Sequence, residues 1–339
     1  MKKYPVVSCI IPNRNEEHYI AHCLDSILAN DYPEDRLEIL VIDGMSTDRS
    51  LEIIQEYISR YMFIKLINNP KGTVSTALNI GIRKANGEII VRFDAHTTYA
   101  PDYIRQCVTL LQTTEAANVG GMMQAVGTSY ISDAIAIAVT SLFGTGGARY
   151  RCSNREEWVD TVFPGAWYKS TLKSLVGFNE EWVANEDYEL NYRLRQTGGK
   201  ILLSPKLIYQ YYVRSTLKTL ILQYFNYGLW KVKTLVAHPG SLQLRQLVPP
   251  VFALALVVSL LFFSVSFTAG IIVPGLYSMA NLAASIWAAR RHGWKYFPLL
   301  PIIFVSLHLS WAMGFSAGLA RFGIPCLSSK SLLSFCSRK

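Results

Sequence analysis

The sequence lacks the signatures of a zinc protein, of a P-loop ATPase and of an exported protein. Its six cysteines, at positions 9, 23, 107, 152, 326 and 336, form no CxxC or CxxH pair, which argues against a zinc site. The loop at residues 69–75 lacks the Gly-Lys-Ser/Thr ending of a Walker A motif. The N-terminus runs from Met1-Lys2-Lys3 into a strand pattern too short for a signal-peptide core, so we expect no export signal.

A dense basic run is also missing, although the chain carries a formal net charge of +9. Lys and Arg are scattered and lie partly beside hydrophobic segments, whereas nucleic-acid-binding proteins gather them in a patch or stripe. The charge pattern therefore favours a membrane surface as partner and argues against nucleic acid.

Apolar residues are unevenly distributed along the 339 residues. The sequence is of ordinary mixed composition to about Val236 and then contains three long apolar segments, at about 247–267, 269–289 and 297–320, each long enough to span a membrane. We expect a cytoplasmic α/β domain at residues 1–236, with a basic, aromatic interfacial helix at 214–233 near its end, and a membrane region at 237–339.

The number of membrane crossings stays open at this stage. The basic loop at residues 290–295 fits the cytoplasmic side if the first two segments form a hairpin. A third crossing would then leave Arg321, Lys330, Arg338 and Lys339 outside, against the positive-inside rule. Either all three segments cross, or one of them, such as the stretch with Pro298 and Pro301, is re-entrant or interfacial.

Short apolar runs alternate with amphipathic stretches through the first half of the chain. Strands are expected at about 6–11, 37–42, 65–67, 89–93 and 119–122, and helices at about 19–28, 48–57, 76–85 and 185–194. Short connections between alternating strands and helices predict a doubly wound, mostly parallel sheet.

Asp94 and His96 follow the apolar run 89–93, where a buried parallel strand would end. Open α/β sheets bind ligands beyond the carboxyl ends of their strands, and residues two apart in an extended segment project to the same side. The two side chains could therefore bind one divalent cation. Alternatively, Asp94 caps the next turn and His96 is solvated.

Four ordered motifs carry a resemblance to a known family. They are Cys9-Ile10-Ile11-Pro12-x-x-Asn15-Glu16-Glu17, Val41-Ile42-Asp43-Gly44-x-Ser46-Thr47-Asp48, Ala77-Leu78-Asn79-x-Gly81 and Gly87-Glu88-Ile89-Ile90. Over about residues 5–235 the chain resembles the family 2 inverting glycosyltransferases, and the segment 142–150 is similar to the succinoglycan-type exopolysaccharide glucosyltransferases of bacteria. The resemblance implies a GT-A fold, a nucleotide-sugar donor and Mg or Mn.

The resemblance also implies roles for single residues. It assigns Pro12, Arg14, Glu16 and Asp43 to the nucleotide, Lys71 to the donor phosphates, and Asp94 to the first acid of the family's Asp-x-Asp. His96 departs from that motif, and because imidazole suits Mn better than Mg, a preference for Mn is expected. The catalytic base is placed in the acidic pair Glu186-Asp187, at Asp187.

The function implied by the resemblance is inverting transfer of a hexose, with glucose expected, from a nucleoside diphosphate donor, with a UDP-sugar expected, to a lipid-linked sugar acceptor. The reaction would serve exopolysaccharide or cell-surface glycan assembly at a bacterial-type inner membrane.

Three alternatives are a processive polysaccharide synthase, a non-catalytic nucleotide-sugar-binding membrane protein, and a transporter or scaffold. Processive synthases carry Gln-x-x-Arg-Trp, whereas this chain has Gln223-Tyr224-Phe225-Asn226-Tyr227, which favours transfer of a single sugar. The apolar segments hold few of the polar groups that a transporter needs.

Overall fold

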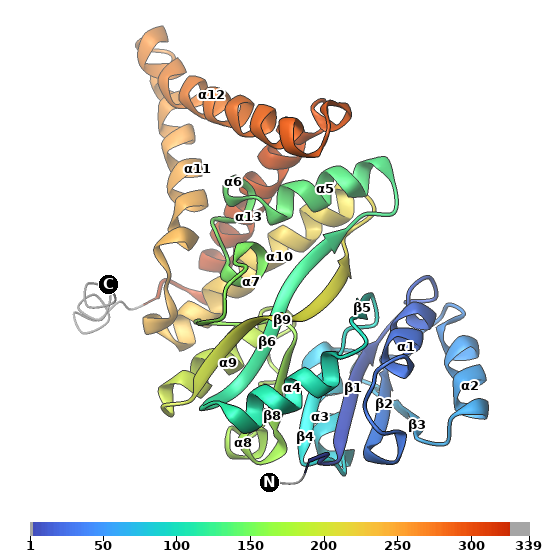
Figure 1. Ribbon diagram of the computed structural model, residues 1–339. Helices are drawn as coiled ribbons and strands as arrows, with labels where there is room; N and C mark the ends of the chain where they lie inside the picture. The colour runs from blue at the N-terminus through green and yellow to red at the C-terminus, as the bar shows by residue number, and fades with distance from the viewer. Residues whose placement is uncertain (1–2, 326–339) are drawn as a thin grey trace. The chain divides into compact units, whose positions relative to one another are not determined.

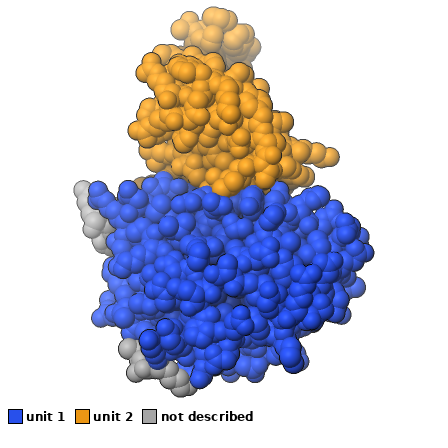
Figure 2. All heavy atoms as spheres, turned by 45° about the vertical axis from the view of Figure 1, so that its right-hand side comes forward, with its two compact units in different colours: residues 1–124, 149–212 blue, residues 125–148, 213–339 orange. Residues whose placement is uncertain are grey.

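The computed structural model describes residues 3–325, which pack as two compact units (Figure 2). The first unit comprises residues 1–124 and 149–212, and the second comprises residues 125–148 and 213–339. These units differ in two places from the domains expected from the sequence, which met at residue 236. The segment 125–148 and the helix expected at 214–233 both pack with the C-terminal helices.

The first half of the first unit forms the parallel part of a sheet (Figure 1). Its strands lie in the order β3-β2-β1-β4 and all of these pairs are parallel. They are β1 (Val7–Asn13), β2 (Leu37–Asp43), β3 (Ile64–Asn68) and β4 (Ile89–Arg92), joined by α1 (Ile20–Leu28), η1 (Glu34–Arg36), α2 (Ser50–Arg60) and α3 (Val74–Lys84). These strands agree with the sequence prediction to within two residues at either end.

The second half of the sheet is antiparallel, so the expectation of a mostly parallel sheet holds only for β1 to β4. The order continues β8-β6-β9-β5, with β7 beside β9, which gives nine strands within the described residues. The elements are β5 (Thr97–Tyr99), α4 (Tyr103–Thr113), β6 (Ala116–Val126), α7 (Arg149–Cys152), β7 (Glu157–Trp158), β8 (Gly165–Tyr168), α8 (Lys169–Ser174), α9 (Glu186–Gln196) and β9 (Lys200–Tyr212).

The small residues of the sequence motifs have packing roles. A Cβ at Gly81 of α3 would lie 2.5 Å from Cγ2 of Ile10 in β1, so glycine lets this helix approach the sheet closely. Gly87, just before β4, would place a Cβ 2.6 Å from the backbone nitrogen of Ser8. These two motif glycines therefore set the spacing of the parallel layer.

The second unit consists of helices. They are α5 (Tyr130–Thr140), α6 (Leu142–Thr145), α10 (Leu217–Ala237), η2 (Pro239–Ser241), α11 (Leu244–Phe262), α12 (Phe267–His292), η3 (Trp294–Tyr296) and α13 (Leu300–Phe322). Among the described residues, α11, α12 and α13 are long and apolar enough to cross a membrane, and they fall on the three apolar segments expected from the sequence.

Polar contacts explain why residues 125–148 belong to this helical unit. The Tyr296 hydroxyl lies 3.1 Å from Asp133 Oδ2, and His308 Nε2 lies 2.8 Å from the carbonyl oxygen of Phe143. Arg245, at the start of α11, donates to the carbonyl of Gly147 at 3.3 Å. The segment is thus attached to the loop after α12, to α13 and to α11.

Candidate functional site

Asp43 lies at the carboxyl end of β2, where its side chain is tightly held. Asn13, its register partner on β1, donates to Oδ1 at 2.8 Å, and Ser46 donates to the same carboxylate through its backbone N–H at 2.9 Å and its hydroxyl at 2.6 Å. Asp43 is 2% exposed. This fixed acceptor stands beside Pro12, which is paired with Ile42 on the same edge of the sheet.

The loops after β1 and β2 are joined by hydrogen bonds. The backbone N–H of Thr47 donates to Asn15 Oδ1 at 2.8 Å, and the backbone N–H of Glu16 donates to Ser50 Oγ at 2.8 Å. Asn15 itself adopts a positive φ of 56°, so its backbone turns sharply after β1. Ser50 and Asn15 therefore have structural roles in shaping the loop edge.

The expected donor residues Arg14 and Lys71 lie on adjoining loops. Arg14 donates to the carbonyl of Gly72 at 3.3 Å, and a Cβ at Gly44 would lie 3.3 Å from both Cβ of Arg14 and Cα of Gly72. The structure thus brings Arg14, Asp43 and the residue next to Lys71 to one edge. The side chain of Arg14 is exposed, so its guanidinium is accessible to a ligand there.

Lys71 forms an ion pair with Glu180 at 2.8 Å, and its own side chain is 72% exposed. Glu180 also accepts from Asn79 Nδ2 at 3.2 Å, and Asn79 Oδ1 accepts from the backbone N–H of Phe178 at 2.8 Å. The Asn of the Ala77-Leu78-Asn79 motif therefore holds the loop before α9. Through Glu180 that loop also holds the expected phosphate-binding lysine.

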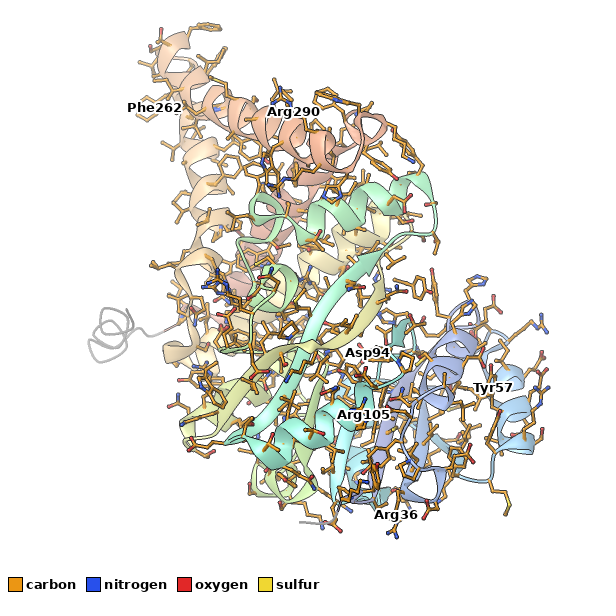
Figure 3. All side chains as sticks on the ribbon, in the orientation of Figure 1. Arg36, Tyr57, Asp94, Arg105, Phe262 and Arg290 are labelled. Carbon is orange, nitrogen blue, oxygen red and sulfur yellow. The ribbon has the colours of Figure 1, made fainter. Side chains whose placement is uncertain are left out.

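Asp94 and His96 follow β4, but the segment between them turns. The Thr97 backbone N–H donates to the Asp94 carbonyl at 3.1 Å, so the extended geometry expected from the sequence is wrong here. The Asp94 carboxylate accepts from Arg92 Nε at 2.9 Å, whereas His96 Nδ1 lies 3.1 Å from Glu16 Oε1. Figure 3 labels Asp94 at the end of this strand.

Arg92 joins the end of β4 to the start of α9. Besides Asp94, its guanidinium contacts Glu186, with Nη1 3.1 Å from Oε1, and its central carbon lies 4.9 Å from the ring centroid of Phe163. The Arg92 side chain is 4% exposed, and that of Glu186 is 9% exposed. A buried guanidinium thus contacts Asp94, the acid expected from the sequence to bind a metal, and one member of the acidic pair.

The acidic pair opens α9, where the helix dipole favours negative charge. Glu186 is buried, whereas Asp187 is half-buried. Burial raises the pKa of Glu186 to about 7; Arg92 opposes that shift and Asp187 adds to it. Burial also raises the pKa of Asp187, with Arg92 opposing and Asp94 adding to the rise. The two carboxyls therefore interact and titrate as a pair.

Hydrogen bonds of other buried side chains hold the first turns of α9 in place. Glu189, which is 1% exposed, holds Arg193 by two hydrogen bonds at 2.7 and 2.9 Å, and Arg193 donates to the carbonyl of Gly177 at 2.8 Å. Asn191 donates to Thr161 Oγ1 at 2.9 Å and accepts from Asn118 at 2.8 Å. The acidic pair is therefore presented by a helix with little freedom to move.

The residues at the end of β4 fit a divalent cation that is bound partly by the protein and partly by the phosphates of a diphosphate. Three acidic side chains, those of Asp94, Glu186 and Asp187, lie around the single guanidinium of Arg92. Within residues 3–325 no three His, Cys, Asp or Glu side chains are grouped as a metal site. Mg²⁺ is commonly bound by one or two carboxylates together with substrate phosphates and water, so Asp94 alone would be a sufficient protein ligand.

Sequence reasoning did not select Arg92 or Phe163. The signal for Arg92 was a charged residue inside the apolar run 89–93, since Arg is rarely buried without a partner. Phe163 had no comparable signal, because its place under the guanidinium depends on how the segment before β8 folds back. Gln223 and Trp230 contact Tyr227 and Phe322 within the helical unit.

Comparisons with known proteins show which family the chain resembles. A family described as Glycosyl transferase family 2 matches residues 8–166. The succinoglycan biosynthesis protein ExoA of Rhizobium meliloti is 30% identical over 308 residues, covering 90% of this chain and 92% of that protein.

Two further comparisons extend over most of the chain. A dolichyl N-acetyl-alpha-D-glucosaminyl phosphate 3-beta-D-2,3-diacetamido-2,3-dideoxy-beta-D-glucuronosyltransferase of Methanococcus voltae is 30% identical, covering 93% of this chain and 97% of that protein. The mannosyltransferase PcManGT of Pyrobaculum calidifontis, solved with GDP-Man and Mn²⁺, matches with a TM-score of 0.62 and 18% identity, covering 92% of this chain and 87% of that one. This likeness confirms the expected GT-A-type α/β fold.

Proposed function

The chain belongs to glycosyl transferase family 2, and from that premise we propose that it transfers one hexose, with inversion, from a nucleoside diphosphate sugar to a lipid-linked sugar acceptor. Its relatives place it in exopolysaccharide or glycan biosynthesis. The proposal adds glucose as the sugar, a UDP-sugar as the donor, the unit of residues 1–124 and 149–212 as a catalytic unit in the cytoplasm, and a bacterial-type inner membrane as the location. The Methanococcus relative, named for a dolichyl phosphate-linked acceptor, supports a lipid-linked acceptor here.

The observation that carries the mechanism is the difference between the two acids at the start of α9. Glu186 is buried and ion-paired with Arg92, whereas Asp187 is half-buried and so accessible to an acceptor. Asp187 would remove the proton of the acceptor hydroxyl as its oxygen attacks the anomeric carbon. The bond to the nucleoside diphosphate breaks on the opposite face, so the configuration inverts without a covalent sugar–enzyme intermediate.

The donor is assigned to the loop edge around Asp43. Asp43 and Pro12 would contact the nucleotide with Arg14 and Glu16, and Lys71 would exchange its partner Glu180 for donor phosphate. A divalent cation held by Asp94, with His96 as a second candidate ligand, would neutralise the charge of the diphosphate leaving group. Arg92 would keep the Asp94 carboxylate oriented from the protein side.

The test is sugar transfer by the full-length protein in membranes, with a panel of radiolabelled nucleotide sugars and extracted lipid acceptors. We expect Asp187→Asn to lower turnover by roughly 10²–10⁴, the contribution of general-base catalysis, and to leave nucleotide-sugar affinity nearly unchanged, because Asn keeps the shape but accepts no proton.

Asp35→Asn is the matched control, because Asp35 is 76% exposed and contacts Arg36 on the surface. Glu186→Gln tests the rival base. Normal turnover in Asp187→Asn together with its collapse in Glu186→Gln would transfer the role to Glu186. If no nucleotide sugar supports transfer to any lipid acceptor, the proposed reaction is wrong.

A further inference from the structure

The three candidate spans differ in how far the protein covers them. In the most apolar stretch of each helix, the buried share is 6% in α11, 17% in α12 and 44% in α13. The exposed residues within α13 are mostly on one stripe, because their positions recur at nearly whole helical turns: Ile302, Met313, Ser316 and Ala320. α13 is apolar on all sides, but the protein covers most of it. It therefore exposes less surface to lipid than α11 or α12 does.

α13 packs closely along α10, and Figure 1 shows the two helices side by side in yellow and red. A Cβ at Gly314 would lie 1.9 Å from the Phe225 carbonyl oxygen, and one at Gly228 would lie 2.1 Å from the Trp311 carbonyl oxygen. A Cβ at Gly318 would lie 2.7 Å from the Leu229 carbonyl oxygen. Backbone therefore meets backbone, as in close helix pairs with small residues at the interface.

These contacts also give the relative direction of the two helices. Phe225 of α10 contacts Gly314, Leu229 contacts Gly318, and Trp230 lies 5.7 Å from the ring of Phe322. Later residues of α10 thus meet later residues of α13, so the helices run parallel. The last residue of α13 lies near the end of α10.

The end of α13 also lies near the start of α11. Phe322 and Leu242, which stands two residues before α11, pack on the same hydrophobic cluster of Val232, Leu235 and Phe315. If α11, α12 and α13 all crossed the membrane, the start of α11 and the end of α13 would be on opposite sides of a hydrocarbon core about 30 Å thick. A shared cluster excludes that arrangement, so an even number of the three helices crosses.

Short connections decide which helices these are. Residues 213–216 join β9 to α10, and four residues at about 3.5 Å each cannot cross the core, so α10 begins on the catalytic side. α10 carries Lys218, Lys231 and Lys233 and is not among the candidate spans. A parallel helix packed along a non-crossing helix does not cross either, which leaves α11 and α12.

From this packing we propose that α11 and α12 form a membrane-crossing hairpin, and that α13 lies beside α10 in the plane of the leaflet on the catalytic side. The proposal rests on the proposed function, which places the catalytic unit in the cytoplasm. Its partner is the lipid surface, with Ile302 and Met313 of the exposed stripe against acyl chains. Arg290, Arg291 and Arg321 then lie on one side, which agrees with the positive-inside rule.

Cysteine labelling of the full-length protein tests this arrangement. In a background with Cys152, Cys326 and Cys336 changed to Ser, which keeps the buried Cys9, Cys23 and Cys107, three variants with one added cysteine each report on the two faces: Val265→Cys between α11 and α12, Trp294→Cys between α12 and α13, and Ile324→Cys after α13. The native side chains are 79%, 59% and 86% exposed. A membrane-impermeant maleimide is applied to right-side-out spheroplasts and to inverted vesicles.

We expect Val265→Cys to react only in spheroplasts, and Trp294→Cys and Ile324→Cys only in inverted vesicles. Reaction of Ile324→Cys in spheroplasts would overturn the proposal, as would reaction with a membrane-permeant maleimide alone, which would place the end of α13 in hydrocarbon. Arg321→Cys repeats the measurement if Ile324→Cys does not accumulate. Sugar transfer is assayed separately, so its absence would refute the enzyme function without changing the labelling pattern.

Discussion

Arg92 is the residue whose removal should disturb both the stability and the chemistry of the catalytic unit. Arg92→Met keeps an apolar stem beside Phe163 but removes the Nε contact to Asp94 at 2.9 Å and the Nη1 contact to Glu186 at 3.1 Å. Both acids are buried, so the change leaves carboxylates without their positive partner. Breaking a buried ion pair from one side typically costs about 3–5 kcal/mol.

For a unit of this size that cost corresponds to a fall of roughly 10 °C in the midpoint of thermal unfolding. The assay is thermal unfolding of the purified full-length protein in detergent, followed by intrinsic fluorescence. Arg105→Met is the matched control: Arg105, labelled in Figure 3, also contacts two acids, Asp31 at 2.7 Å and Asp102 at 3.4 Å, but on the surface. Exposed pairs contribute little, so we expect almost no shift in this control.

The loss of folding stability in Arg92→Met should also depend on pH. The pKa of Glu186 is raised to about 7, so its contribution to stability is fully present below its unfolded pKa and is lost as pH rises through the folded value. Arg92 lowers the pKa values of Glu186 and Asp187, and without it both carboxyls should protonate at higher pH. The Arg92→Met deficit should therefore be larger at about pH 8 than at about pH 5.

Equal unfolding midpoints for Arg92→Met and wild type, or a deficit that grows as the pH falls, would refute this reasoning. A double variant separates the contacts further. If Glu186 is destabilising once its partner is gone, Glu186→Gln added to Arg92→Met should restore part of the lost stability.

Three other outcomes follow from the same structure. A chelator should abolish sugar transfer and Mn²⁺ or Mg²⁺ should restore it, whereas full activity of metal-stripped enzyme or of Asp94→Ala would reject the metal assignment. High salt without detergent should leave the full-length protein in membranes, because screening releases adsorbed proteins but not inserted helices; release by salt would count against any span. Gly81→Ala should destabilise by about 1–3 kcal/mol, because its Cβ would lie 2.5 Å from Ile10, and an unchanged unfolding midpoint would show that α3 shifts freely.

The sequence predicted the parallel half of the sheet well because its strands are continuous apolar runs ended by polar loops. β2, for example, is buried along its whole length from Leu37 to Asp43, which is the pattern of a strand covered on both faces. The antiparallel half was poorly predicted. β6 and β9 mix buried and exposed residues, and β8 holds four residues, so neither length nor periodicity distinguished them from loops.

The sequence also could not show which segments pack together across long separations. Residues 125–148 precede β8 in the chain, yet their polar contacts are with α11, η3 and α13, through Arg245, Tyr296 and His308. α5 is apolar and short, and such a helix reads equally well as part of a soluble core. Three-dimensional contacts were needed to assign it to the helical unit.

The acidic pair shows how structure separates two residues that sequence treats alike. Glu186 and Asp187 are neighbours at a helix start, where either could be a dipole-stabilising acid or a base. One residue along a helix turns the side chain by about 100°, and here that rotation directs Glu186 into a buried contact with Arg92 and leaves Asp187 half-buried. Because Arg92 also contacts Asp94, its single guanidinium would fix the position of Asp94 relative to Glu186, the neighbour of the proposed base. The proposed base can then be accessible while the groups around it remain rigid.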